Sequence, residues 1–93
     1  MSERRHEPVF PGFREMSERR RAVTDSFVAA RSAQGLSQTE VAARMGTSQS
    51  AVARLESAEV DAKLSTIERY AAAIGQRVEY RVVDDRARRR RTA

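Results

Sequence analysis

The stretch that decides the fold of this chain covers residues 35–56 and reads GLSQTEVAARMGTSQSAVARLE. Within it, Ser37 and Glu40 have the spacing of a capping box, in which each side chain accepts a hydrogen bond from a free backbone N–H at a helix start. Gly46 permits a backbone reversal that a residue with a Cβ would resist. The pattern predicts two short helices joined by a tight turn.

We expect the first of these helices over residues 38–45 and the second from Gln49 to about Ser57, with Thr47 or Ser48 as its N-cap. Apolar side chains of the two helices would face each other across the turn. They are Val41, Ala42, Met45, Val52 and Leu55.

Upstream of this pair, apolar residues at three- and four-residue spacing predict an amphipathic helix from about Ser17 to Gln34. They are Val23, Phe27 and Ala30. Gly35 stands where a helix would end in the left-handed conformation.

Downstream of the pair, after a polar loop over residues 58–63, Ser65 and Glu68 have the spacing of a second capping box. An apolar stripe then predicts a helix that Gly75 ends. The stripe consists of Ile67, Tyr70, Ala71 and Ile74. The fold class that follows is all-α.

Residues 76–83 change to the period of two that is typical of a half-buried strand. Val78, Tyr80 and Val82 alternate there with Arg77, Glu79 and Arg81. A single strand cannot satisfy its own backbone hydrogen bonds, and no other part of the chain has a strand pattern. We therefore expect the strand to pair with a second copy in a homodimer.

The 93 residues leave room for one small domain. We divide the chain into a mobile N-terminal arm over residues 1–16, a helical domain over 17–75, the dimerisation strand over 76–83, and a basic, disordered tail over 84–93. The arm holds apolar residues that could contact a partner, namely Val9, Phe10 and Phe13.

Composition limits the classes of function. A net charge of +5 and a sequence pI near 10.9 suit a polyanionic partner. The chain has no Cys and a lone His6, which leaves no basis for a thiolate metal site, a cofactor or a catalytic constellation. We therefore expect a protein that is not an enzyme. Because no apolar run is long enough for a membrane span and the N-terminus lacks a signal pattern, we also expect it to be cytoplasmic.

The polar face of the helix that starts at Gln49 has the chemistry of a DNA major-groove reader. Gln49 and Arg54 can each bond two atoms of one base edge, and Ser50 lies on the same face. The alternative for all three is a solvated helix face. Phosphate contacts are expected from Gln38, at a helix N-terminus, and from Thr47 and Lys63, although Lys63 could also be an ordinary surface lysine.

These residues resemble the Cro/repressor helix-turn-helix family, also called the XRE family. The resemblance spans roughly residues 23–75 and rests on Arg31, Gly35-Leu36-Ser37-Gln38, Val41-Ala42, Gly46, Ser48-Gln49, Val52, Arg54, Glu56, Leu64-Ser65-Thr66-Ile67 and Gly75. It implies a compact bundle of four or five helices that binds palindromic double-stranded operator DNA as a dimer.

The same resemblance assigns roles to single residues. It makes Gln38 a phosphate contact, Gln49, Ser50 and Arg54 the base readers, and Arg31 and Glu56 a structural ion pair. One departure is Ala58, because the family usually has glycine there, and we expect the following loop to take a different path.

Residues 64–82 resemble the ending of HigA-like antitoxins, which repress their own operon and neutralise a RelE-like (HigB-like) ribonuclease toxin. The resemblance implies a toxin partner, with Val9, Phe10 and Phe13 or the basic tail as the contact. The alternative is a stand-alone regulator without a toxin. Non-specific nucleic-acid binding by the arginines at 86 and 88–91 could accompany either role.

Overall fold

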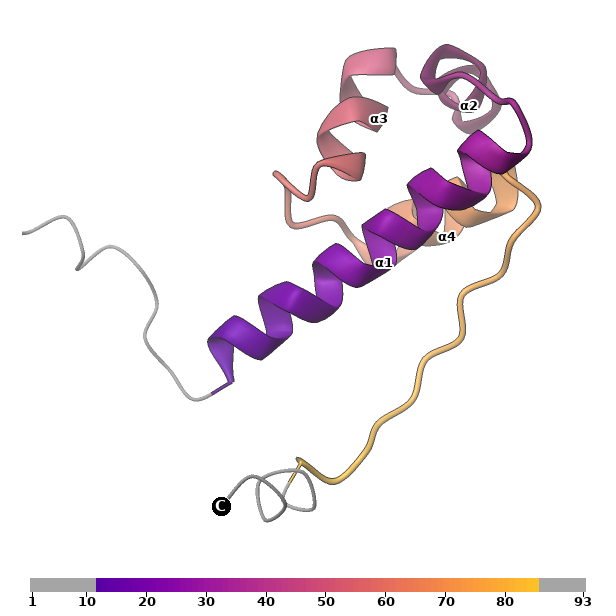
Figure 1. Ribbon diagram of the computed structural model, residues 1–93. Helices are drawn as coiled ribbons and strands as arrows, with labels where there is room; N and C mark the ends of the chain where they lie inside the picture. The colour runs from indigo at the N-terminus through magenta and orange to yellow at the C-terminus, as the bar shows by residue number, and fades with distance from the viewer. Residues whose placement is uncertain (1–11, 86–93) are drawn as a thin grey trace, which may run out of the picture.

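The computed structural model describes residues 12–85 and shows four helices among them (Figure 1). They are α1 (Phe13–Ala33), α2 (Gln38–Met45), α3 (Gln49–Glu56) and α4 (Leu64–Ala73). The short α2 packs against both α3 and α4, and α1 packs against α3. The prediction of an all-α bundle containing a helix-turn-helix is confirmed.

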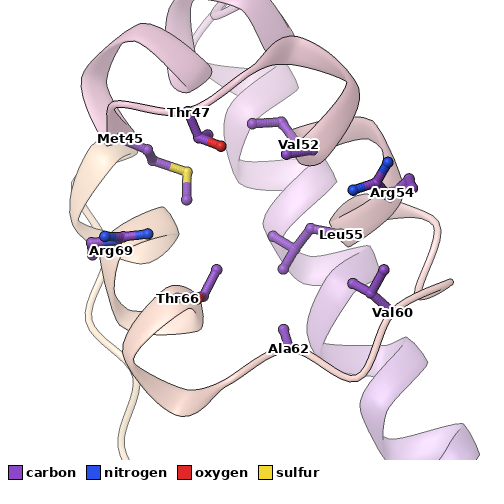
Figure 2. Close-up of a pocket in the computed structure, with 10 residues that line it drawn as sticks. Met45, Thr47, Val52, Arg54, Leu55, Val60, Ala62, Thr66 and Arg69 are labelled. Carbon is purple, nitrogen blue, oxygen red and sulfur yellow. The ribbon is translucent and has the colours of Figure 1, made fainter.

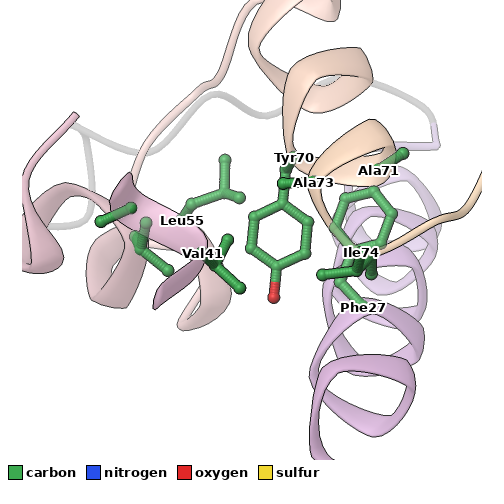
Figure 3. Packing of buried hydrophobic residues seen from close by; sticks show 9 residues of the cluster. Phe27, Val41, Leu55, Tyr70, Ala71, Ala73 and Ile74 are labelled. Carbon is green, nitrogen blue, oxygen red and sulfur yellow. The ribbon is translucent and has the colours of Figure 1, made fainter. Parts of the chain in front are cut away.

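The core lies where the four helices meet (Figure 3). Its fully buried large side chains are Val41, Val52, Tyr70 and Ile74. Phe27 of α1 stacks on Tyr70 of α4 with ring centroids 4.6 Å apart. Stacked aromatic rings stabilise a fold by more than the burial of their apolar surface alone. Val23, which the sequence pattern placed on the same stripe as Phe27, is 40% exposed. Helix α1 therefore contributes to the core mainly through its C-terminal half.

Helix α1 begins at Phe13, four residues before the expected start. Its N-cap is Gly12, in the left-handed conformation at φ 85° and without a side-chain cap, so the usual Ser, Thr, Asp or Asn signal is missing. The N–H of Met16 donates to the carbonyl of Gly12 at 2.9 Å and closes the first turn. The N-terminal half of α1 extends beyond the other helices (Figure 1).

Helix α4 begins at Leu64, one residue before the expected cap. Its N-cap is Lys63, which makes no side-chain capping bond, so the capping box predicted for Ser65 and Glu68 is wrong. Ser65 already lies inside the first turn. The other end of α4 is held from two sides: Gln34 donates to the carbonyl of Ile74 at 2.7 Å, and Arg44 donates to that of Ala73, also at 2.7 Å.

The strand expected over residues 76–83 is not formed in the single chain. The segment leaves the end of α4 and continues without regular secondary structure and without joining a sheet (Figure 1). Strand structure requires hydrogen bonds to a neighbouring strand, and the part of the chain that the structure describes contains no second strand. Among the described residues the fold class is therefore all-helical.

Candidate nucleic-acid interface

The turn between α2 and α3 fixes how α3 is presented. Both bonds of the predicted capping box are present: the N–H of Glu40 donates to Ser37 Oγ at 3.0 Å, and the N–H of Ser37 donates to Glu40 Oε1 at 2.7 Å. Gly46 adopts φ 74°, and the N–H of Thr47 donates to the carbonyl of Ala42 at 2.9 Å. Because this turn is closed by backbone bonds, it holds the two helices in a fixed relation.

Ser48 is the N-cap of α3, accepting from the N–H of Ala51 at 3.1 Å. The helix then divides into two sides. Val52, Leu55 and Glu56 are buried, whereas the three predicted base readers are exposed. Those three are Gln49, Ser50 and Arg54. The polar side of α3 is thus free to meet a ligand while the opposite side is part of the core.

The predicted base readers differ in their bonds. The hydroxyl of Ser50 lies 3.3 Å from that of Ser48, and Gln49 donates to Gln38 Oε1 at 2.5 Å. The side chain of Arg54 forms no hydrogen bond or ion pair with any residue that the structure describes. Its guanidinium therefore keeps all its donors available for a base edge or a phosphate.

Gln38, the predicted phosphate contact, connects the exposed side of α3 with its buried end. Its amide nitrogen donates to Glu56 Oε1 at 2.9 Å, while its amide oxygen accepts from Gln49. Gln38 and Gln49 have separate predicted roles, and nothing in the sequence indicates that their side chains touch. The two side chains orient one another at the point where α2 and α3 start.

Behind Gln38 lies a buried ionic cluster, which we define as Arg31, Glu56 and Tyr70. Arg31 Nε donates to Glu56 Oε2 at 2.6 Å, and its Nη2 donates to Oε1 at 3.0 Å, so the ion pair implied by the family resemblance is formed in bidentate geometry. Arg31 also donates to the carbonyl of Leu36 at 2.8 Å. The hydroxyl of Tyr70 donates to Glu56 Oε2. The cluster ties α1, α3 and α4 together.

The electrostatics of the cluster follow from its burial. Burial raises the pKa of Glu56, but the hydrogen bonds from Arg31, Tyr70 and Gln38 outweigh it and hold that pKa below its ordinary value. Burial and the hydrogen bond to Glu56 raise the pKa of Tyr70. Glu56 is therefore an ionised carboxylate at neutral pH, and Tyr70 remains a donor. Nothing in the sequence identified the Tyr70 hydroxyl as its partner.

The two other predicted phosphate contacts lie at element boundaries. Thr47 is half-buried in the turn before α3, and Lys63 is exposed at the N-cap of α4. Between these elements, Ala58 adopts φ 61°, a conformation that glycine takes readily. Ala58 therefore forms a left-handed turn at a cost in strain.

A cavity of about 260 Å³ opens beside α3 (Figure 2). Its lining is largely apolar and includes Met45, Val52, Leu55 and Val60. Arg54 and Arg69 lie on opposite sides of it (Figure 2). The cavity gives the side chain of Arg54 free space on its inner side.

The remaining predicted sites are less complete. Phe13 is half-buried at the start of α1, and Val9 and Phe10 lie outside the described residues. In the expected dimerisation strand, Val78 packs against the core, Tyr80 donates to Glu68 Oε2 at 3.1 Å, and Val82 is fully exposed. Among the described residues, no helix is both long and apolar enough to span a membrane.

A capped α2, a glycine turn and an α3 with one buried and one polar side define a protein of the helix-turn-helix class, whose second helix enters the DNA major groove in known cases. The helix-turn-helix family model matches residues 29–80, so the chain belongs to the helix-turn-helix family. No solved structure gives a significant match.

Two curated relatives are similar over most of the chain. Both are named Antitoxin HigA1 and come from Mycobacterium tuberculosis, strains CDC 1551 / Oshkosh and ATCC 25618 / H37Rv. Each is 43% identical over 72 residues, which is 77% of this chain and 48% of the relative. The chain thus spans about half the length of the curated relatives it matches.

Proposed function

We propose that this protein is a sequence-specific repressor that places α3 in the major groove of double-stranded DNA. The observation that carries the proposal is the polar side of α3, where the guanidinium of Arg54 has no partner among the described residues and Gln49 is oriented by Gln38. Arginine reads guanine and glutamine reads adenine through paired hydrogen bonds. Family membership supports the same role.

Contacts to the phosphates would flank this reading face. Gln38 lies in the first turn of α2, where free N–H groups and the helix dipole favour an anion. Thr47 and Lys63 are the further candidates. The bonds from Gln38 to both Glu56 and Gln49 favour a rigid site in which a phosphate contact and a base contact hold one another in place.

The protein would act as a homodimer on a palindromic operator in the cytoplasm. A two-fold dimer of helix-turn-helix units spaces its half-sites about 34–36 Å apart, which is one turn of DNA. We assign dimerisation to residues 76–83, with Val78, Tyr80 and Val82 on the paired strand. The support is the exposure of Tyr80 and Val82 in the single chain.

We further propose that the protein is the antitoxin of a toxin–antitoxin pair and represses its own operon. The name of the two relatives supports this role, and a RelE-like (HigB-like) toxin is the partner it suggests. Val9, Phe10 and Phe13 remain the candidate toxin contacts. The alternative is a stand-alone regulator, and an adjacent open reading frame for a small basic protein would decide between them.

The DNA-binding proposal is tested by selecting bound sequences from a random library at fixed salt, with wild type, Arg54→Ala and Gln38→Ala. We expect Arg54→Ala to lose preference at one base pair of each half-site, and Gln38→Ala to weaken all sequences alike. Arg21→Ala removes the same charge from an exposed site on α1 and serves as the control. Wild-type binding without sequence preference would contradict the proposal.

A further inference from the structure

Within the described residues 12–85, the backbone groups of residues 77–83 have no hydrogen-bond partner. The last backbone bond before them runs from the N–H of Gln76 to the carbonyl of Ala71 at 2.8 Å. Three large side chains of the segment also face solvent: Tyr80 is 51% exposed, Val82 102% and Val83 66%. An extended segment with free N–H and C=O groups is a template for pairing with another strand.

One face of this segment is attached to the bundle. Val78 packs against the core, and the hydroxyl of Tyr80 donates to Glu68 on α4 at 3.1 Å. Because side chains alternate along an extended strand, Val82 shares the face of these two residues. Val82 nevertheless finds no cover in the single chain. A second copy that supplies this cover must bring an apolar side chain to the same face.

A symmetric antiparallel pair of copies can be centred on only a few residues. In an antiparallel pair, side chains that lie directly opposite each other are on the same face of the ribbon. Neighbouring residues of one strand point to opposite faces, so the two-fold axis must place one residue opposite its own copy and cannot pass between two neighbouring residues. A pair centred on Glu79 would place Arg77 opposite Arg81, and a pair centred on Arg81 would place that arginine opposite itself. Like charges in directly opposite positions are destabilising.

Of the centres on residues 78–81, two avoid this repulsion. A pair centred on Val78 would place Arg77 opposite Glu79, but Arg81 would then lie opposite Gly75 and Val82 opposite Ile74, the C-cap of α4. A helix end cannot continue the ladder, so the exposed Val82 and Val83 would stay uncovered. A pair centred on Tyr80 has no such conflict.

We propose that two copies join through residues 77–83 as an antiparallel ribbon whose two-fold axis passes beside Tyr80. In this register Glu79 lies opposite Arg81 twice, and Val78 lies opposite Val82 twice. Each copy then brings its Val82 beside the Val78 that already packs on the core of the other. The proposal rests on the homodimer of the proposed function and adds its register.

Exchange of charges tests this register without changing the net charge of the chain. Glu79→Arg alone and Arg81→Glu alone create two like-charge pairs each, and we expect the dimer dissociation constant to rise about tenfold in sedimentation. The double variant Glu79→Arg/Arg81→Glu restores both opposite-charge pairs and should dimerise like wild type. The matched control Arg77→Glu/Glu79→Arg keeps the opposite-charge pairs of a ribbon centred on Val78 but places the arginine introduced at position 79 opposite Arg81 in a ribbon centred on Tyr80, so we expect it to stay weak.

Cysteine cross-linking gives a second readout, because the chain contains no cysteine of its own. Under mild oxidation Tyr80→Cys should form a disulfide-linked dimer, since the two substituted residues lie directly opposite. Val78→Cys should not, because the register separates the two copies of that position by four residues, roughly 13 Å along the strands. Circular dichroism verifies that each variant keeps the helical content of wild type.

The register would be overturned if Arg77→Glu/Glu79→Arg restored dimerisation and Val78→Cys formed the cross-link. It would also be overturned if all charge variants dimerised like wild type and neither cysteine variant formed a cross-link. Both assays run without DNA. A wild-type chain that selects an operator while the charge exchange fails would therefore refute the ribbon alone. A wild-type chain that passes the exchange and selects no DNA sequence would refute the proposed function alone.

Discussion

Arg54 and Glu56 lie two residues apart on α3 in opposite environments. Glu56 is 8% exposed and accepts hydrogen bonds from Arg31, Gln38 and Tyr70, whereas Arg54 is exposed and its side chain has no partner among the described residues. One short helix thus uses one side to hold the bundle together and keeps the other side available for a ligand. Substitutions on the two sides should therefore change different measured properties.

The largest expected effect is on the buried side. Arg31→Met removes the cation that neutralises Glu56 and leaves a buried carboxylate without its ion pair. We expect the free energy of unfolding to fall by roughly 3 kcal/mol, toward the lower end for buried pairs because the Arg31 side chain is 15% exposed. Chemical denaturation monitored by circular dichroism measures this change.

Arg77→Ala is the control for that experiment, since it removes an arginine from an ion pair that is mostly exposed. The Arg77–Glu79 pair has a similar separation of 2.8 Å, but its side chains are 84% and 73% exposed. We expect a change within about 0.5 kcal/mol. Equal losses for the two variants would contradict the claim that burial gives the Arg31–Glu56 pair its weight.

Tyr70→Phe should have the next largest effect. The substitution keeps the aromatic ring that stacks on Phe27 and deletes only the hydroxyl that donates to Glu56. A hydrogen bond to a charged group contributes about 1.5–3 kcal/mol, so we expect a loss in that range in the same denaturation assay. A change below about 0.5 kcal/mol would show that Arg31 and Gln38 satisfy the carboxylate without Tyr70.

The smallest expected stability effect concerns the loop after α3. Ala58 has φ 61°, a conformation that costs an L residue with a Cβ about 1–2 kcal/mol. Ala58→Gly would remove this cost, but glycine also has more conformational freedom in the unfolded chain, which offsets part of the gain in stability. We therefore expect the substitution to stabilise the protein by up to about 1 kcal/mol. Thermal unfolding measures the change, and a lower melting temperature would show that the turn is not strained.

The sequence predicted the helix-turn-helix closely because its signals are local. Ser37 with Glu40 marks one helix start, Gly46 permits the reversal, and the bounds of α2 agree with the expected range. The predictions for the start of α1 and the cap of α4 were less accurate, because Gly12 and Lys63 cap these helices without a side-chain hydrogen bond. Local patterns cannot reveal such caps.

Contacts between distant residues were harder to foresee. The hydroxyl of Tyr70 meets Glu56 only because α4 packs beside α3, and the bond between Gln38 and Gln49 depends on the angle of the turn. Periodicity marked Tyr70 as an apolar core residue and gave no reason to assign it a polar partner. The strand over 76–83 is a different case, because its pairing requires a second copy of the chain.

The central claim, that α3 separates stability from recognition, is tested most directly by measuring two properties of Arg54→Ala in one preparation. We predict a free energy of unfolding within about 0.5 kcal/mol of wild type. We also predict a loss of about 1–3 kcal/mol of discrimination at one base pair in each half-site of the selected DNA. A destabilised variant that keeps the wild-type base preference would contradict the account.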